Sequence, residues 1–218
     1  MKRVIYCMSG LGADERAFKK LNINNAELVT LPWLEPKKSE PMEAYANRML
    51  AGIDHPEPVL IGLSFGGMMS MEIARQMPVK TVILISSVKS SAELPRWMKW
   101  AGMIKINKLF PIKSARFMEP ITNRTLGISS EEEKTMVRDF RKHSPVKYNN
   151  WAVDQILNWK YAYPTQPVFQ IHGNKDLVFP IKKLSPTHII EGGKHLMIMS
   201  KAKEVSGCIN SILASLPE

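Results

Sequence analysis

Short apolar runs alternate with helix-like segments along this chain. The runs are rich in β-branched residues and predict six strands, at residues 4–8, 26–31, 58–62, 81–85, 167–171 and 187–190. Apolar residues at helical spacing predict four helices between and after them, at residues 14–21, 42–53, 65–77 and 202–216. Asp14 and Ser39 are the expected N-caps of the first two helices. Apolar strands separated by helices are typical of a parallel sheet covered on both faces.

A long stretch without a strong strand signal separates the fourth and fifth predicted strands. Its helical patterns lie near residues 94–109, 113–122, 129–141 and 148–160. The third of them begins with Ser129-Ser130 and three glutamates, and hydroxyl caps and first-turn carboxylates both favour a helix start. We therefore expect a core domain of residues 1–87 and 167–218, with a helical cap of residues 88–166 inserted into it.

Charge is concentrated in this predicted cap. The chain of 218 residues has a formal net charge of +10, and residues 88–166 contribute +7 of it. Such a segment could meet an anionic group of a substrate, nucleic acid or a membrane surface, or form a solvated helical face. No Arg-rich tract, zinc-finger spacing or RNA-binding aromatic motif indicates nucleic acid. The solvated face is the simplest interpretation.

The N-terminal segment and the two cysteines bear on where in the cell the protein is expected. The apolar stretch after Arg3 is too short for a signal peptide, and no stretch of the sequence is long and apolar enough to span a bilayer. Cys7 and Cys208 offer neither a disulfide framework nor a metal-binding spacing. We expect a cytoplasmic monomer or homodimer that does not insert stably into a membrane.

The run Gly62-Leu63-Ser64-Phe65-Gly66-Gly67 directly follows the third predicted strand and opens a helix. A sharp strand-to-helix turn of this kind holds a serine in a strained conformation with its hydroxyl exposed above the sheet. Glycine is expected at 62 and 66 because side chains there would collide with neighbouring elements, and at 67 because the helix packs closely on the sheet. Gly-x-Ser-x-Gly is also a simple βα turn in some chains, so its meaning depends on the partners of Ser64.

Two candidate partners of Ser64 each follow a later strand. Asp176 lies in the loop after the fifth strand, and His195 lies after the sixth, behind Gly192-Gly193. Carboxyl ends of parallel strands share one edge of a sheet, so all three side chains should meet there. His172 is the nearest rival of His195, and we expect it to brace the Asp176 loop.

The turn after the first strand, Ser9-Gly10-Leu11-Gly12, reaches the same edge. An acyl-transfer site needs two N–H donors where the oxyanion forms. We assign them to the backbone amides of Leu11 and Phe65. A glycine-containing βα turn without a chemical role is the alternative.

These motifs resemble those of the α/β-hydrolase superfamily. The resemblance extends from Val4 to Leu216 and is carried by Gly62–Gly67, His172-Gly173-x-x-Asp176 and Gly193-x-His195. It implies an α/β fold with a six-stranded, mainly parallel sheet flanked by helices and a helical cap between the fourth and fifth strands.

The sequence departs from the superfamily's pattern in two places. The sheet starts at the strand that is third in larger members, and Ser9-Gly10 stands where many members have His-Gly. The missing strands are peripheral to the predicted site. The change at Ser9 weakens the assignment of Leu11.

The predicted function is hydrolysis of small to medium carboxylic esters through Ser64, His195 and Asp176, without a metal or organic cofactor. Two alternative functions remain, because proteins with these functions resemble the same Ser, His and Asp pattern. One is that of a lyase or carbon–carbon bond hydrolase, and the other is that of a slow hydrolase that acts as a ligand receptor. Epoxide hydrolases and haloalkane dehalogenases resemble the fold with Asp in place of Ser64. A small-molecule ester is thus the expected partner.

The predicted cap supplies candidate pocket residues. Trp97, Trp100, Met103 and Phe117 would form an apolar, adaptable pocket over the site. Such residues at helical spacing also serve as the cap's own packing. The stretch from Arg96 to Lys105 is basic and amphipathic, which would suit a membrane surface as well.

Overall fold

The computed structural model describes residues 2–104, 119–164 and 166–217. Its centre is one sheet of six parallel strands in the order β2-β1-β3-β4-β5-β6. The strands are β1 (Arg3–Met8), β2 (Ala26–Thr30), β3 (Val59–Leu63), β4 (Thr81–Ile85), β5 (Val168–Gly173) and β6 (His188–Ile190). All six predicted strands are confirmed, and the sheet is fully parallel rather than mainly so.

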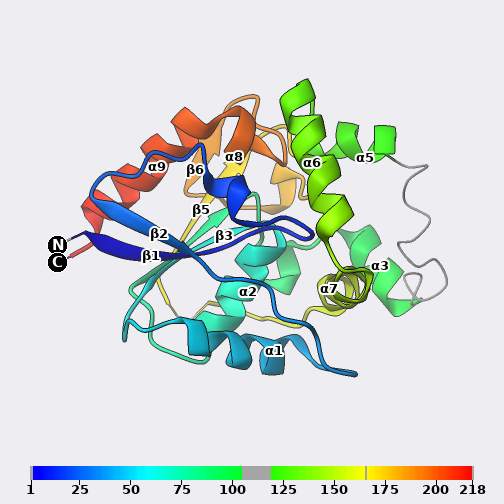
Figure 1. Ribbon diagram of the computed structural model, residues 1–218, viewed down its shortest axis with the longest axis horizontal. Coiled ribbons are helices and arrows are strands. Elements are labelled where there is room, and N and C mark those ends of the chain that lie inside the picture. Colours follow the sequence, from blue (N-terminus) through cyan, green and yellow to red (C-terminus); the bar gives the residue numbers. More distant parts are fainter. Residues whose placement is uncertain (1, 105–118, 165, 218) are drawn as a thin grey trace.

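Helices cover both faces of this sheet, as its apolar strands require. One face carries α1 (Met42–Met49) and α2 (Phe65–Ala74), and the other carries α8 (Met197–Ser200) and α9 (Ala202–Ser215) (Figure 1). Each face has its own buried core because side chains alternate along a strand. On β1, Tyr6 and Met8 face the α1–α2 core, while Ile5 and Cys7 face the α9 core.

Two of the predictions about helices differ from the structure, one in the length of the helix and one in its N-cap. The segment after Asp14 forms only the short 3₁₀ helix η1 (Glu15–Phe18), although Asp14 caps it by accepting a hydrogen bond from the Arg16 amide. The prediction that Ser39 caps α1 is wrong. Pro41 holds the N-cap position, and Ser39 adopts a positive φ of 55° in the turn before it.

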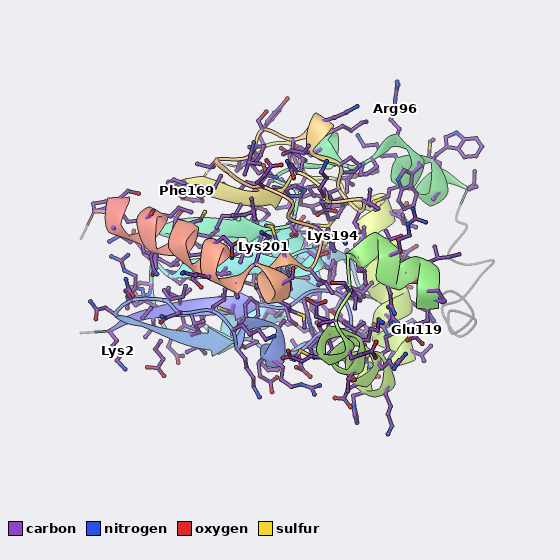
Figure 2. All side chains as sticks on the ribbon, turned by 90° about the horizontal axis from the view of Figure 1, so that it is seen from above. Lys2, Arg96, Glu119, Phe169, Lys194 and Lys201 are labelled. Carbon is purple, nitrogen blue, oxygen red and sulfur yellow. The ribbon has the colours of Figure 1, made fainter. Side chains whose placement is uncertain are left out.

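Between β4 and β5 the chain forms an insertion of helices. Those described are α3 (Arg96–Met103), α5 (Glu119–Leu126), α6 (Glu131–His143) and α7 (Val146–Asn158). Ser130 and Glu133 form the reciprocal capping bonds that start α6, close to the helix start that the sequence predicts. The four helices lie at the end of the molecule opposite the two chain termini (Figure 1). Figure 2 likewise shows Arg96 and Glu119 far from Lys2.

The insertion is tied to the core by polar contacts as well as packing. The Trp151 indole donates to the Glu40 carbonyl (2.7 Å), and the Gln155 side chain accepts from the Met42 amide at the start of α1. At the other side, the amide of Leu196 donates to the carbonyl of Leu126 at the end of α5. The insertion therefore contacts the loop that carries His195.

Candidate active site

Ser64 stands at the turn between β3 and α2 in a backbone conformation that L-residues rarely adopt, with φ 51° and ψ −116°. The flanking glycines allow this turn. A Cβ at Gly62 would overlap the backbone of Gly67, and one at Gly66 would overlap the carbonyls of Met8 and Ser9. A Cβ at Gly67 would overlap the Ser87 side chain after β4. The structure therefore shows the close contacts that the sequence predicts at the three glycines. The turn holds the half-buried Ser64 at the carboxyl edge of the sheet.

The structure brings Ser64, His195 and Asp176 together in one line of hydrogen bonds. His195 Nε2 lies 2.9 Å from Ser64 Oγ, and His195 Nδ1 lies 2.8 Å from Asp176 Oδ2. A carboxylate only accepts hydrogen bonds, so Nδ1 carries the proton and donates to Asp176. Nε2 is then free to accept from the Ser64 hydroxyl. His195 and Asp176 are both buried, which strengthens these contacts.

Asp176 is held as an anion by its surroundings. Burial raises the pKa of its carboxyl, but the electrostatic attraction and hydrogen bond of the His195 ring, with further contributions from His172 and the Phe179 amide, outweigh burial and keep the pKa below its usual value. The second carboxylate oxygen accepts from the amides of Val178 (2.8 Å) and Phe179 (3.0 Å). The loop backbone therefore fixes the carboxylate that orients His195.

His172 braces this loop, as the sequence suggests. Its Nε2 donates to the Phe179 carbonyl at 2.8 Å, and burial lowers the pKa of the ring, which keeps it neutral. The Asp176 and His195 loops are also joined directly, because the Lys175 amide donates to the Gly193 carbonyl. A Cβ at Gly173 would overlap that same carbonyl, so glycine is needed for this close approach.

The turn after β1 lies against Ser64. A Cβ at Gly10 would lie 3.6 Å from the Ser64 Cβ. Within the described part of the chain, neither the Leu11 amide nor the Phe65 amide donates a hydrogen bond.

Ser9 has a role in this turn that sequence reasoning missed. Its hydroxyl donates to the Ala13 carbonyl (2.7 Å) and accepts from the Trp33 indole (2.9 Å). It thus closes the turn that presents Leu11 and ties the turn to the loop after β2. A hydroxyl two residues before Leu11 was visible in the sequence, but its partner Trp33 was not.

Comparison with solved structures identifies a known fold. A thermophilic esterase from Thermogutta terrifontis superposes with a TM-score of 0.74 at 15% identity, over 97% of this chain and 89% of that one. A bromoperoxidase from Bacillus anthracis superposes with a TM-score of 0.75 at 15% identity, over 99% and 93%. A Bacillus megaterium epoxide hydrolase superposes with a TM-score of 0.70 at 13% identity, over 99% of this chain and 94% of that one.

This protein has the α/β-hydrolase fold. No protein-family model matches its sequence, and no curated protein is significantly similar to it. At these identities the likeness establishes the fold of this chain, while its chemistry must be argued from its own residues.

A cavity of about 780 Å³ adjoins the turn after β1. Its wall comes from that turn, from the loop after β2 and from the junction of α6 and α7. The lining includes Ser9, Gly12, Leu31, Trp33, Phe140 and Tyr148. Ser64, Asp176 and His195 are not part of this wall. Trp33 connects the cavity wall with the turn at Ser64, since its ring stacks on the ring of Phe65 with centroids 5.3 Å apart.

The predicted pocket residues on α3 lie elsewhere. The side chains of Trp97, Trp100 and Met103 are 61%, 64% and 70% exposed, and none of them lines this cavity. Met98 and Gly102 face inward instead, and Gly102 lies directly against the Leu157 carbonyl of α7. Phe117 lies outside the described residues. A glycine on the inner face lets α3 pack closely on α7, which leaves the tryptophans on the outer face.

Two further features of the described ranges bear on chemistry. No group of three His, Cys, Asp or Glu side chains in residues 2–104, 119–164 and 166–217 is placed to hold a metal ion. No helix within these ranges has the length and apolar character needed to cross a bilayer.

Proposed function

We propose that this protein is a serine hydrolase that cleaves carboxylic esters of small to medium size. The hydrogen-bonded line from Ser64 through His195 to Asp176 carries this proposal. The fold likeness to an esterase supports it, because the same scaffold serves ester hydrolysis there. The presence of serine, rather than aspartate, at position 64 argues against epoxide chemistry.

In the acylation step, Ser64 Oγ attacks the ester carbonyl carbon while His195 Nε2 takes the hydroxyl proton. The carbonyl oxygen becomes an oxyanion and accepts hydrogen bonds from the Leu11 and Phe65 amides. The imidazolium is stabilised by the Asp176 carboxylate. As the tetrahedral intermediate collapses, His195 Nε2 returns the proton to the leaving alkoxide, and the alcohol departs.

Deacylation repeats these steps with water. His195 Nε2 takes a proton from a water molecule that attacks the acyl carbon, and the same two amides stabilise the second oxyanion. Collapse returns the proton to Ser64 Oγ and releases the carboxylic acid. The residues of the chain supply every proton transfer, so the proposed reaction uses no metal or organic cofactor.

Labelling with a fluorophosphonate probe tests this proposal. The probe should modify wild-type protein at Ser64 and leave Ser64→Ala unmodified. A panel of 4-nitrophenyl esters of increasing acyl length then defines the preferred size, with a cyanohydrin-cleavage assay beside it. Multiple turnovers of esters support the hydrolase. Cyanohydrin cleavage without ester turnover would assign a lyase, and one stable acylation per chain would assign a receptor.

A further inference from the structure

The hydroxyl of Ser87, in the turn just after β4, contacts the backbone of the nucleophile. Ser87 is fully buried, and its Oγ donates to the Ser64 carbonyl at 2.6 Å. The same carbonyl accepts from the amides of Gly67 (2.9 Å) and Met68 (3.4 Å), which are ordinary bonds of a helix start. The bond from Ser87 is the shortest of the three, and it comes from a different element of the fold. A side chain outside the triad therefore holds the turn at Ser64.

The Ser64 carbonyl belongs to the same peptide unit as the Phe65 N–H, one of the two donors that the proposed reaction uses for the oxyanion. A peptide unit is planar, so a bond that fixes the direction of the carbonyl also fixes that of the N–H. A donor on the carbonyl oxygen also polarises the unit, which makes its N–H a stronger donor, and this effect is larger in a buried site. The Ser87 hydroxyl therefore acts on the Phe65 amide through the peptide that joins Phe65 to Ser64.

The turn that carries Ser87 is held in turn by β5. Ser86 has a φ of 48°, in the left-handed region that residues other than glycine rarely adopt. Such a conformation persists where the surrounding structure fixes it. The Ser86 amide donates to the Ile171 carbonyl (3.1 Å), and the Ser87 carbonyl accepts from the side chain of the buried Gln170 (2.8 Å). The Ser87 hydroxyl is thus fixed before any substrate arrives.

Gly67 provides the space for this hydroxyl. A Cβ at position 67 would overlap both Oγ and Cβ of Ser87, whereas a Cβ at Gly66 would overlap the end of β1. The two glycines after Phe65 therefore admit two different neighbours. The absence of a side chain at Gly67 and the bond from Ser87 to Ser64 are parts of one arrangement, because the bond could not form beside a bulkier residue.

We propose that Ser87 is a positioning residue of the oxyanion site, whose hydroxyl fixes and polarises the peptide unit that presents the Phe65 N–H. The proposal rests on the hydrolase reaction proposed for Ser64. The Phe65 N–H gains most from this polarisation when negative charge develops on the substrate oxygen. Loss of the Ser87 hydroxyl should therefore slow the reaction and leave substrate binding nearly unchanged.

Ser87→Ala tests this by removing the hydroxyl while keeping the Cβ. For a preferred 4-nitrophenyl ester, kcat should fall by about tenfold while KM changes by less than about twofold, because the lost interaction acts in the transition state. Ser87→Cys has a similar volume but a weak donor, so its kcat should fall nearly as far. A kcat that is normal in Ser87→Cys and low in Ser87→Ala would assign the effect to packing and overturn the proposal.

Ser70→Ala is the matched control, because Ser70 is also fully buried and its Oγ donates to the Gly66 carbonyl of the same helix at 2.8 Å. That carbonyl shares its peptide unit with the Gly67 amide, which has no assigned part in the oxyanion site. Ser70→Ala and Ser87→Ala should lose similar stability in urea unfolding, but Ser70→Ala should keep kcat within about twofold. Equal kcat values in the two variants, or a rise in KM in place of the fall in kcat of Ser87→Ala, overturn the proposal.

Amide nitrogen chemical shifts test the contact without catalysis. Loss of a hydrogen bond to a carbonyl moves the nitrogen signal of the same peptide unit upfield. With phenylalanine and glycine isotopically labelled, Ser87→Ala should shift Phe65 more than any other phenylalanine, whereas Ser70→Ala should shift Gly67.

These measurements separate the proposal from the hydrolase proposal. Ester turnover with an unmoved Phe65 signal in Ser87→Ala rejects the role of Ser87 and leaves the hydrolase intact. Wild-type protein that neither hydrolyses esters nor is labelled at Ser64 rejects the hydrolase, and the catalytic role of Ser87 with it. The Phe65 signal then still decides whether the hydroxyl polarises this peptide unit.

Discussion

The carboxyl edge of the sheet and the aromatic cluster of Trp33, Tyr45 and Tyr148 beside it differ in how their polar groups are satisfied. At the sheet edge, Ser64, His195 and Asp176 bond to one another, and the loop amides donate to the second carboxylate oxygen of Asp176. In the aromatic cluster, the buried Tyr148 hydroxyl has no partner among the described residues. A reaction needs groups that are fixed before a substrate arrives, and of these two regions only the sheet edge has all of its polar groups fixed in this way.

Ser64→Ala tests the sheet edge with the largest expected effect. Removal of the hydroxyl eliminates the nucleophile, so kcat for a preferred 4-nitrophenyl ester should fall by about 10⁶-fold. The melting temperature should change little, because the hydroxyl is half-buried and its packing is preserved. Retention of more than a small fraction of the activity would mean that another residue performs the attack.

Asp176→Asn tests the orienting role of the carboxylate. An amide at this position favours the wrong imidazole tautomer, so kcat should fall by about 10⁴-fold. Fluorophosphonate labelling should slow in parallel, since it needs the same activated serine. If labelling stayed at the wild-type rate, the bond between His195 and Asp176 would serve the fold rather than the reaction.

Gly66→Ala tests whether the turn at Ser64 depends on close backbone approach. The new Cβ would overlap the carbonyls at the end of β1, so the free energy of unfolding should fall by about 3 kcal/mol or more. Gly207→Ala in α9 is the control, because a Cβ there meets nothing within 4 Å. That variant should gain about 0.5–1 kcal/mol from helix propensity. Urea unfolding measures both.

Trp97→Ala and Trp100→Ala should have the smallest effects. Both side chains are mainly exposed and neither lines the cavity, so acyl-length preference should shift by less than about twofold and stability by less than about 0.5 kcal/mol. The ester panel and thermal unfolding measure these effects. A marked change in length preference would support the sequence prediction that α3 contributes to the pocket.

The elements that local pattern governs were predictable. Apolar runs predict the six strands. Gly62, Gly66 and Gly67 predict the sharp turn at Ser64, because the residues that must lack a side chain lie in the turn itself. Asp176 and His195 could be placed as well, since parallel strands bring the residues that follow them to one edge. The start of α6 was predictable too, because Ser130 and Glu133, whose side chains cap its N-terminus, are close in sequence.

The sequence by itself thus determined the sheet, the turn and which side chains meet at its edge. Only the tertiary structure decided which face of α3 packs on α7, which partner Ser9 binds and which buried hydroxyl is left without a partner among the described residues. Trp33, Tyr148 and the turn at Ser9 are far apart in sequence, and no periodicity relates them. Their meeting depends on how separate elements pack, and whether a polar atom finds a partner is settled only after that packing is complete.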